Sequence, residues 1–188
     1  MKIGIFGGSF NPIHIGHLIT IEEVKQKLKL DKVLFIPTYK PPHKNPQVSY
    51  EHRRNMVALA IKDNPSFELC EIEKELGGIS WTIETLKALH KHYQNDKLYL
   101  ILGSDQYCLL KTWKQPQDLV KYAKLVIMPR PDVVGRMRKS KNTIIVNVSQ
   151  ISIASKNLRN DIKHGKSIRY KVVDKVYDYI KKHKLYLA

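Results

Sequence analysis

Cysteine is scarce in this sequence of 188 residues, and the two that occur, Cys70 and Cys108, stand far apart. Neither belongs to a CxxC pair, and neither lies at the Cys/His spacing of zinc ligands. A disulfide framework and a structural zinc site are therefore poorly supported. Two reduced thiols are the simpler interpretation.

Long apolar runs are also lacking, so no segment has the length of a membrane-spanning helix. The start, Met1 to Phe6, has no long apolar stretch followed by small residues, and glycines arrive too early for a signal peptide. The hydrophobic fraction of 43% and the charged fraction of 27% are ordinary for a soluble globular protein. We expect a cytoplasmic protein with no membrane partner.

Acidic residues are few, with 17 Asp and Glu against 33 Lys and Arg, which gives a net charge of +16. A positive excess attracts anions, whether nucleotides, pyrophosphate or nucleic acid. Lysines scattered over solvated helix faces would give the same total. The charge alone leaves these interpretations open.

Short β-rich apolar runs alternate with amphipathic helical patterns along most of the chain. The runs lie at 2–6, 33–36, 67–72, 98–102, 125–128 and 143–148, and the helical patterns at 15–28, 51–61 and 81–90. This alternation predicts an α/β fold with a doubly wound, Rossmann-like parallel sheet that helices cover on both faces.

The pattern changes after residue 148, where two helical stretches, 155–163 and 170–182, flank Gly165. We expect a small C-terminal helical extension, about 149–188, within a single domain spanning 1–188. The proline-rich segment 37–46 predicts an irregular loop that is neither helix nor central strand. Residues 130–141 are expected to form a second polar loop.

The segment GGSFNPIHIGH, from Gly7 to His17, follows the first predicted strand and enters the first predicted helix. Its two leading glycines let the backbone approach phosphate oxygens, and the helix start offers free N–H groups. His14 and His17 are three residues apart, so both imidazoles can face one side, with Gly16 leaving room for a nucleotide. Metal ligation ranks lower, because no acidic residue occupies the HExxH position.

This segment resembles the HxGH signature of the nucleotidyltransferase superfamily, and in its full length it is closest to the bacterial nicotinate mononucleotide adenylyltransferases. Four further segments extend the resemblance over essentially the whole chain: PPHK at 41–44, SWTIETL at 80–86, LGSDQ at 102–106 and ISIASKNLR at 151–159. The resemblance implies an enzyme of NAD biosynthesis. It would transfer the adenylyl group of ATP to nicotinate mononucleotide and release pyrophosphate.

The resemblance also implies roles for individual residues. It makes His14, His17 and Arg159 catalytic. The residues implied to bind ATP are Gly7, Gly8, Ser9, Phe10, Gly103, Asp105, Ser155 and Arg159. The residues implied to bind the mononucleotide are Asn11, His43, Lys44, Thr82, Thr85 and Trp113. Two positions depart from the family pattern, since Ala154 replaces a serine and Lys156 replaces a threonine.

The expected partners are ATP and nicotinate mononucleotide, with Mg²⁺ bridging the triphosphate through water and phosphate oxygens. No carboxylate cage is apparent in the sequence, so no residue is predicted as a metal ligand. The attacking phosphate is already an anion, so no general base is required. The sequence leaves open whether the protein forms a homo-oligomer.

Two alternatives remain at this stage. A sister adenylyltransferase would use nicotinamide mononucleotide, phosphopantetheine or a flavin mononucleotide, because the choice between acid and amide can rest on backbone N–H groups. A basic nucleic-acid-binding protein is the non-enzymatic alternative. The chain has no RNP, KH or zinc-finger signature, and its basic residues are dispersed, so we expect no nucleic-acid partner.

Overall fold

The computed structural model describes residues 1–43, 45–130 and 141–187. The strands in these ranges are β1 (Lys2–Gly8), β2 (Lys32–Pro37), β3 (Phe67–Leu69), β4 (Lys97–Gly103), β5 (Lys124–Met128) and β6 (Thr143–Ile145). The longer helices are α1 (Ile15–Leu28), α2 (Tyr50–Ile61), α4 (Thr82–His92), α7 (Ser155–Lys163) and α8 (Asp174–Lys182). The shorter ones are α3 (Ile72–Leu76), α5 (Ser104–Cys108) and α6 (Leu119–Tyr122), with 3-10 turns η1 (Leu110–Thr112) and η2 (Pro116–Asp118).

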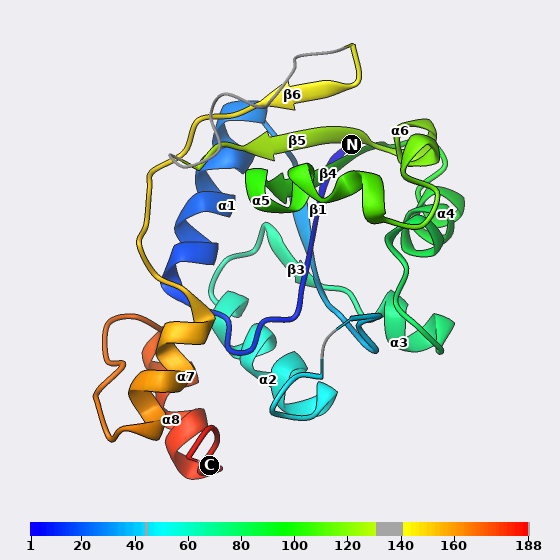
Figure 1. Ribbon diagram of the computed structural model, residues 1–188. Coiled ribbons are helices and arrows are strands. Elements are labelled where there is room, and N and C mark those ends of the chain that lie inside the picture. Colours follow the sequence, from blue (N-terminus) through cyan, green and yellow to red (C-terminus); the bar gives the residue numbers. More distant parts are fainter. Residues whose placement is uncertain (44, 131–140, 188) are drawn as a thin grey trace.

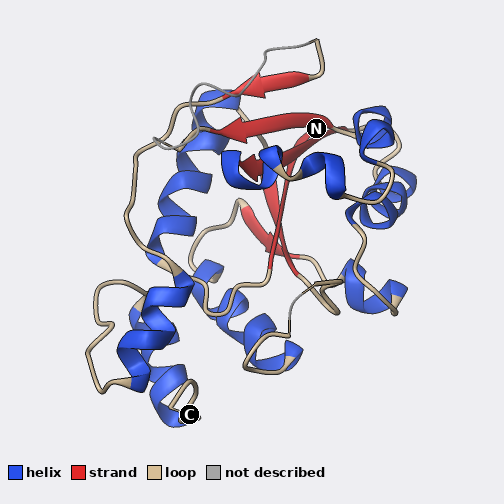
Figure 2. Ribbon diagram, viewed as in Figure 1, coloured by secondary structure: helices blue, strands red, loops and turns tan. Residues whose placement is uncertain are grey.

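The strands form one sheet in the order β3-β2-β1-β4-β5-β6, and every neighbouring pair is parallel (Figure 1, Figure 2). The order runs outward in both directions from β1 and β4, as in a doubly wound sheet. Helices cover both faces, so the predicted α/β, Rossmann-like fold class is confirmed.

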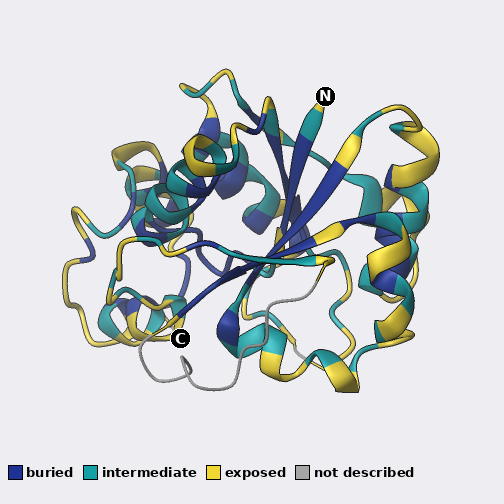
Figure 3. Cartoon of the chain, turned by 90° about the horizontal axis from the view of Figure 1, so that it is seen from above, coloured by how far each residue is buried: buried dark blue, intermediate teal, exposed yellow. Residues whose placement is uncertain are grey.

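Successive residues of each strand point to opposite faces, and each face buries its own apolar cluster. On β4, Leu98 and Leu100 pack with α4 and α6, whereas Tyr99 and Ile101 pack with α1 and α2. Figure 3 shows the strands as a buried centre with exposed residues on the outer helices. Fully burying one such side chain stabilises the fold by roughly 1.5–3 kcal/mol.

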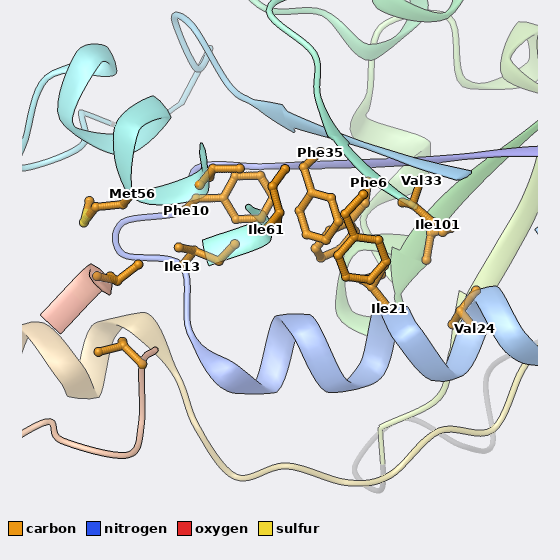
Figure 4. Packing of buried hydrophobic residues seen from close by; sticks show 14 of the residues in the cluster. Phe6, Phe10, Ile13, Ile21, Val24, Val33, Phe35, Met56, Ile61 and Ile101 are labelled. Carbon is orange, nitrogen blue, oxygen red and sulfur yellow. The ribbon is translucent and has the colours of Figure 1, made fainter. Parts of the chain in front are cut away.

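Three phenylalanines at the centre of the first cluster connect the core to the start of α1. The ring centroids of Phe6 and Phe10 are 5.5 Å apart, and those of Phe6 and Phe35 are 5.6 Å apart, both edge to face. Figure 4 shows these rings gathered above α1, from which Ile21 and Val24 point toward the sheet. The turn after β1 is therefore anchored in the core by Phe10.

Several element boundaries differ from the sequence-based prediction. The third strand ends at Leu69 rather than at 72, because the chain leaves the edge of the sheet and starts α3 at Ile72. The sixth strand ends at Ile145 rather than at 148, and α8 begins at Asp174 rather than at 170. Tyr170 has a left-handed φ of 65°, which no α-helix accommodates.

The expected loop at 37–46 also needs correction at its first residue. Pro37 is the last residue of β2, a central strand, and pairs in register with Gly8. A proline is tolerated there because the ladder ends at that residue. The short helices α3, α5 and α6 were not predicted, since four or five residues show no helical period.

The helical extension after β6 packs on the same side of the sheet as α1 and α2. Leu158 of α7 and Val176 of α8 are buried in the cluster that contains Ile21 and Met56. Helix α7 spans the predicted residues, 155–163. No helix within the described ranges has both the length and the apolar character to cross a membrane.

Candidate active site

A cleft of about 1240 Å³ opens at the carboxyl ends of β1 and β4. The connections that leave these two neighbouring strands run to opposite faces of the sheet, which is where a doubly wound fold leaves a crevice. The predicted site residues that line this cleft are Gly7, Gly8, Ser9, Phe10, Asn11, His14, His17, His43, Thr82, Thr85, Gly103, Asp105, Trp113, Ser155 and Arg159. Lys44 lies outside the described residues.

His14 and His17 form a stacked pair at the start of α1. Their ring centroids are 3.6 Å apart and their planes are inclined by 24°. His14 precedes the first helical residue, and its backbone N–H donates to Nδ1 of His17 over 3.2 Å. Because Nδ1 of His17 accepts this bond, the neutral ring carries its proton on Nε2. The prediction that both imidazoles face the same side is confirmed.

Both imidazoles are held in the neutral form. Burial, followed by the charge of Arg130, lowers the pKa of His14 from 6.5 to about 4. Burial, then His14 and then Arg130 hold the pKa of His17 well below its usual range. Nδ1 of His14 is buried without a hydrogen-bond partner among the described residues. Each neutral ring keeps one N–H group, which can donate to an anion.

Two residues of the glycine turn also contact the histidine pair. A Cβ on Gly16 would lie 3.1 Å from Nδ1 of His14 and 3.2 Å from a methyl of Ile151, so this glycine leaves room for the imidazole, and it lines the cleft as well. Phe10 is only 3% exposed, and its ring meets that of His17 edge to face at 5.5 Å. Its side chain therefore supports His17 within the core.

Ser155 and Arg159 use their side chains to hold the turn between β1 and α1. Oγ of Ser155 donates to the carbonyl of Pro12, and Nη1 of Arg159 donates to the carbonyl of Asn11, each over 2.8 Å. The peptide bond between Asn11 and Pro12 is cis. The remaining guanidinium nitrogens of Arg159 and the free N–H groups at the start of α7 stay available to phosphate oxygens.

The segment after β5 brings a cation that sequence reasoning missed. Arg130 lines the cleft, and its Nε lies 3.7 Å from Oδ1 of Asp105. Both side chains are largely exposed, so this pair contributes little to stability and is free to separate. A Cβ on Gly103 would lie 2.5 Å from Oδ1 of Asp105, which explains why a glycine precedes this carboxylate.

Two indole rings line another part of the cleft. Trp81 and Trp113 both line it, and both pack against the second apolar cluster. The ring centroid of the exposed His43 is 6.3 Å from that of Trp81. Of the two tryptophans, only Trp113 was predicted to lie in the site. Trp81, just before α4, has no sequence signal that separates it from a core residue.

Buried Arg53 and half-buried Glu73 bond the loops that follow β1 and β2, and both were also missed. The guanidinium of Arg53, 1% exposed, donates to the carbonyl of Ser9 over 2.9 Å and to that of Tyr39 over 3.4 Å. The carboxylate of Glu73 accepts from the backbone N–H of Tyr39 over 3.1 Å and from Oγ1 of Thr85 over 3.2 Å. Burial raises the pKa of Glu73.

The described residues contain no group of three or more His, Cys, Asp or Glu side chains that could hold a metal ion.

Comparison with known proteins identifies close relatives of this chain. The cytidylyltransferase-like family matches residues 5–169. A protein named "Probable nicotinate-nucleotide adenylyltransferase" from Thermus thermophilus is 38% identical over 187 residues, which is 99% of this chain and 100% of that protein. A protein of the same name from Lactiplantibacillus plantarum is 42% identical over 188 residues, covering 98% of this chain and 88% of that protein.

A solved structure supports the fold independently of sequence. The nicotinic acid mononucleotide adenylyltransferase of Plasmodium falciparum, complexed with NaAD, superposes with a TM-score of 0.84 and covers 98% of this chain and 97% of that one. Its sequence identity is 22%, so the likeness concerns the fold. Together with the full-length relatives, which confirm the resemblance inferred from the sequence, it places this chain in the nicotinate-nucleotide adenylyltransferase family of cytidylyltransferase-like nucleotidyltransferases.

Proposed function

We propose that this chain transfers the adenylyl group of ATP to nicotinate mononucleotide and releases pyrophosphate, giving nicotinate adenine dinucleotide. The observation that carries the proposal is the neutral, stacked histidine pair sharing one cleft with two indole rings. The cleft volume of about 1240 Å³ exceeds the roughly 300–1,000 Å³ typical of single small-molecule sites. It therefore has room for two nucleotides.

ATP binding is assigned to the end of the cleft near α1. We place its triphosphate against Gly7, Gly8 and the two histidines, where backbone N–H groups and imidazoles donate hydrogen bonds. Asp105, directly after β4, is assigned to the ribose hydroxyls, with Gly103 beside it. Ser9 and Phe10 contribute through their backbone, and Ser155 and Arg159 approach the β,γ end from α7.

The mononucleotide is assigned to the end that contains the two indoles. Trp113 offers a face on which a pyridine ring can stack. Thr82 and Thr85 lie at the start of α4 beside this face, and His43 lies on the loop above it. Asn11, His43 and Lys44 are assigned to the phosphate side of this substrate.

The reaction forms one bond and breaks one. An oxygen of the mononucleotide phosphate attacks the α-phosphorus of ATP, and the bond from that phosphorus to the oxygen bridging to the β-phosphate breaks. The electron pair leaves with pyrophosphate. The protein holds two anions in line and stabilises the charge that develops around the α-phosphorus. His14, His17 and Arg159 are the donors that we assign to this charge.

We propose that ATP enters as its Mg²⁺ complex, with the ion bound to phosphate oxygens and water. Mg²⁺ usually keeps several water ligands and is commonly bound through substrate phosphates, which supports an ion brought in by the substrate. We also propose that residues 1–188 act as one domain, because α7 and α8 share the apolar cluster of α1 and α2.

The decisive experiment measures pyrophosphate release from MgATP with four acceptors in parallel: nicotinate mononucleotide, nicotinamide mononucleotide, phosphopantetheine and flavin mononucleotide. The highest kcat/KM is expected with nicotinate mononucleotide. A higher value with another acceptor would identify a sister adenylyltransferase. Salt-sensitive RNA binding without pyrophosphate release from any acceptor would favour the non-enzymatic alternative.

A further inference from the structure

The turn between β1 and α1 lies outside the hydrogen-bond ladders of sheet and helix, so its backbone needs other partners. The C-terminal part of the chain supplies them. Ser155 bonds the carbonyl of Pro12, Arg159 bonds that of Asn11, and the carbonyl of Lys171 accepts from the N–H of Ile15 over 3.0 Å. The segment that carries the histidine pair is thus fastened from one side.

Tyr186 makes the fourth of these contacts. Its hydroxyl donates to Oδ1 of Asn11 over 2.8 Å, across 175 residues of sequence. The phenol is 5% exposed and Asn11 is 8% exposed, so water competes little for this bond. Burial raises the pKa of Tyr186, which keeps the hydroxyl protonated and able to donate.

The backbone conformation at Tyr186 indicates that packing fixes the position of its phenol ring. Its φ is 67°, a left-handed conformation that is unfavourable for a residue with a side chain. Neighbouring Leu185 is buried in the cluster that contains α7 and α8. Apolar packing of the last residues therefore holds the phenol over Asn11 despite the unfavourable backbone.

We propose that Tyr186 is a positioning residue for adenylyl transfer, which fixes the Asn11 turn and through it the geometry of the His14–His17 pair. This inference rests on the proposed function. The hydroxyl of Tyr186 acts through Asn11, three residues before His14, and touches no reacting atom. Its loss is expected to lower the rate of the chemical step more than it lowers substrate affinity.

The test compares Tyr186→Phe with Tyr179→Phe. The hydroxyl of Tyr179 on α8 meets Nδ1 of His52 at 3.0 Å and Nδ2 of Asn55 at 3.1 Å, and Tyr179 does not line the cleft. Both variants lose one phenol hydroxyl from the C-terminal part, so similar small decreases in Tm are expected. Only Tyr186→Phe should lower kcat, by about tenfold, with KM values changed less than about threefold.

A double-mutant cycle then asks whether Tyr186 acts through Asn11. If it does, adding Tyr186→Phe to Asn11→Ala lowers kcat no further than Asn11→Ala alone. The proposal would be overturned if Tyr186→Phe lowered kcat by the same factor in the wild-type protein and in Asn11→Ala. Equal losses of kcat in Tyr186→Phe and Tyr179→Phe would also overturn it.

Failure of the positioning role can be distinguished from failure of the proposed function. If the wild-type protein transfers no adenylyl group, the proposed function is wrong. The positioning role is then tested by NMR, from the signals of the His14 and His17 rings during titration with pyrophosphate. Tyr186→Phe should alter these ring signals and their response, whereas Tyr179→Phe should not. Unaltered signals in Tyr186→Phe would refute the positioning role.

Discussion

The two histidines of the cleft owe their chemistry to burial. Buried against each other and near Arg130, they stay neutral in the free protein. A bound triphosphate brings negative charge to the same place and therefore raises both pKa values. Binding of ATP should therefore take up protons at pH values above about 4, where His14 is uncharged in the free protein. Isothermal titration calorimetry in buffers of different ionisation enthalpy measures this uptake.

Replacing His17 tests its catalytic role. His17→Ala is expected to lower kcat by about 100-fold, since removal of one donor to developing charge has an effect of this size. The lost contacts of the ring with Phe6 and Phe10 should lower the free energy of unfolding by only about 1 kcal/mol. Steady-state kinetics and thermal unfolding of this variant measure the two effects, with His52→Ala as a control at a half-buried histidine that does not line the cleft. A loss of stability that accounts for the whole loss of activity would indicate a structural histidine.

The low pKa of His14 predicts a pH dependence of stability. Its pKa falls from 6.5 to about 4 on folding, so the unfolded chain binds more protons between these values. The free energy of unfolding should therefore decrease as pH drops from about 6.5 to about 4, by about 3 kcal/mol in all from this residue. Urea unfolding of wild type and His14→Gln across this range checks it. Parallel pH profiles for the two proteins would contradict the burial of an uncharged ring.

Among the elements, the segment between β4 and β5 was the hardest to predict. It contains α5, η1, η2 and α6, each too short for a hydrophobic period to appear in the sequence. Helices α1 and α7, by contrast, begin and end where their sequence patterns do, because each has several turns with an apolar stripe. Element length therefore decided which helices the sequence predicted at all.

This irregular segment contains Trp113. Its proposed role can be tested by comparing the KM values of the two substrates. Trp113→Ala should raise KM for nicotinate mononucleotide by about tenfold, the size of one lost aromatic stacking contact, while KM for ATP stays unchanged. Steady-state kinetics with Trp81→Ala in parallel tell which indole stacks on the pyridine. Unchanged KM values for both substrates in Trp113→Ala would remove Trp113 from the pocket.

At the scale of the whole molecule, the charge of +16 acts on anionic substrates before they bind. Raising the ionic strength from about 20 mM to about 200 mM should lower kcat/KM for ATP several-fold and leave kcat nearly unchanged, because salt screens the attraction and not the bound complex. Measuring kcat/KM in the chloride salts of two different cations separates charge screening from specific ion effects. A constant kcat/KM would mean that the lysines only solvate the surface.

Some residues of the site could be predicted from short sequence motifs, whereas others depend on contacts between distant segments. The glycine turn and the imidazole spacing are local, so GGSFNPIHIGH predicted them from the residues alone. Arg53, Glu73 and Tyr186 gave no such signal, because a single arginine, glutamate or tyrosine in a helix or near a chain end has many ordinary roles. Their significance comes from which carbonyl or amide each one meets.

The sequence by itself determined the α/β class, the position of the glycine turn and the family, since these depend on periodicity and short motifs within continuous segments. Only the tertiary structure decided the neutral state of the histidines, the hold of Ser155 and Arg159 on the turn, and the contact of Tyr186 with Asn11. The physical reason is that burial and hydrogen bonding between distant segments arise when the chain folds, and no local pattern encodes them.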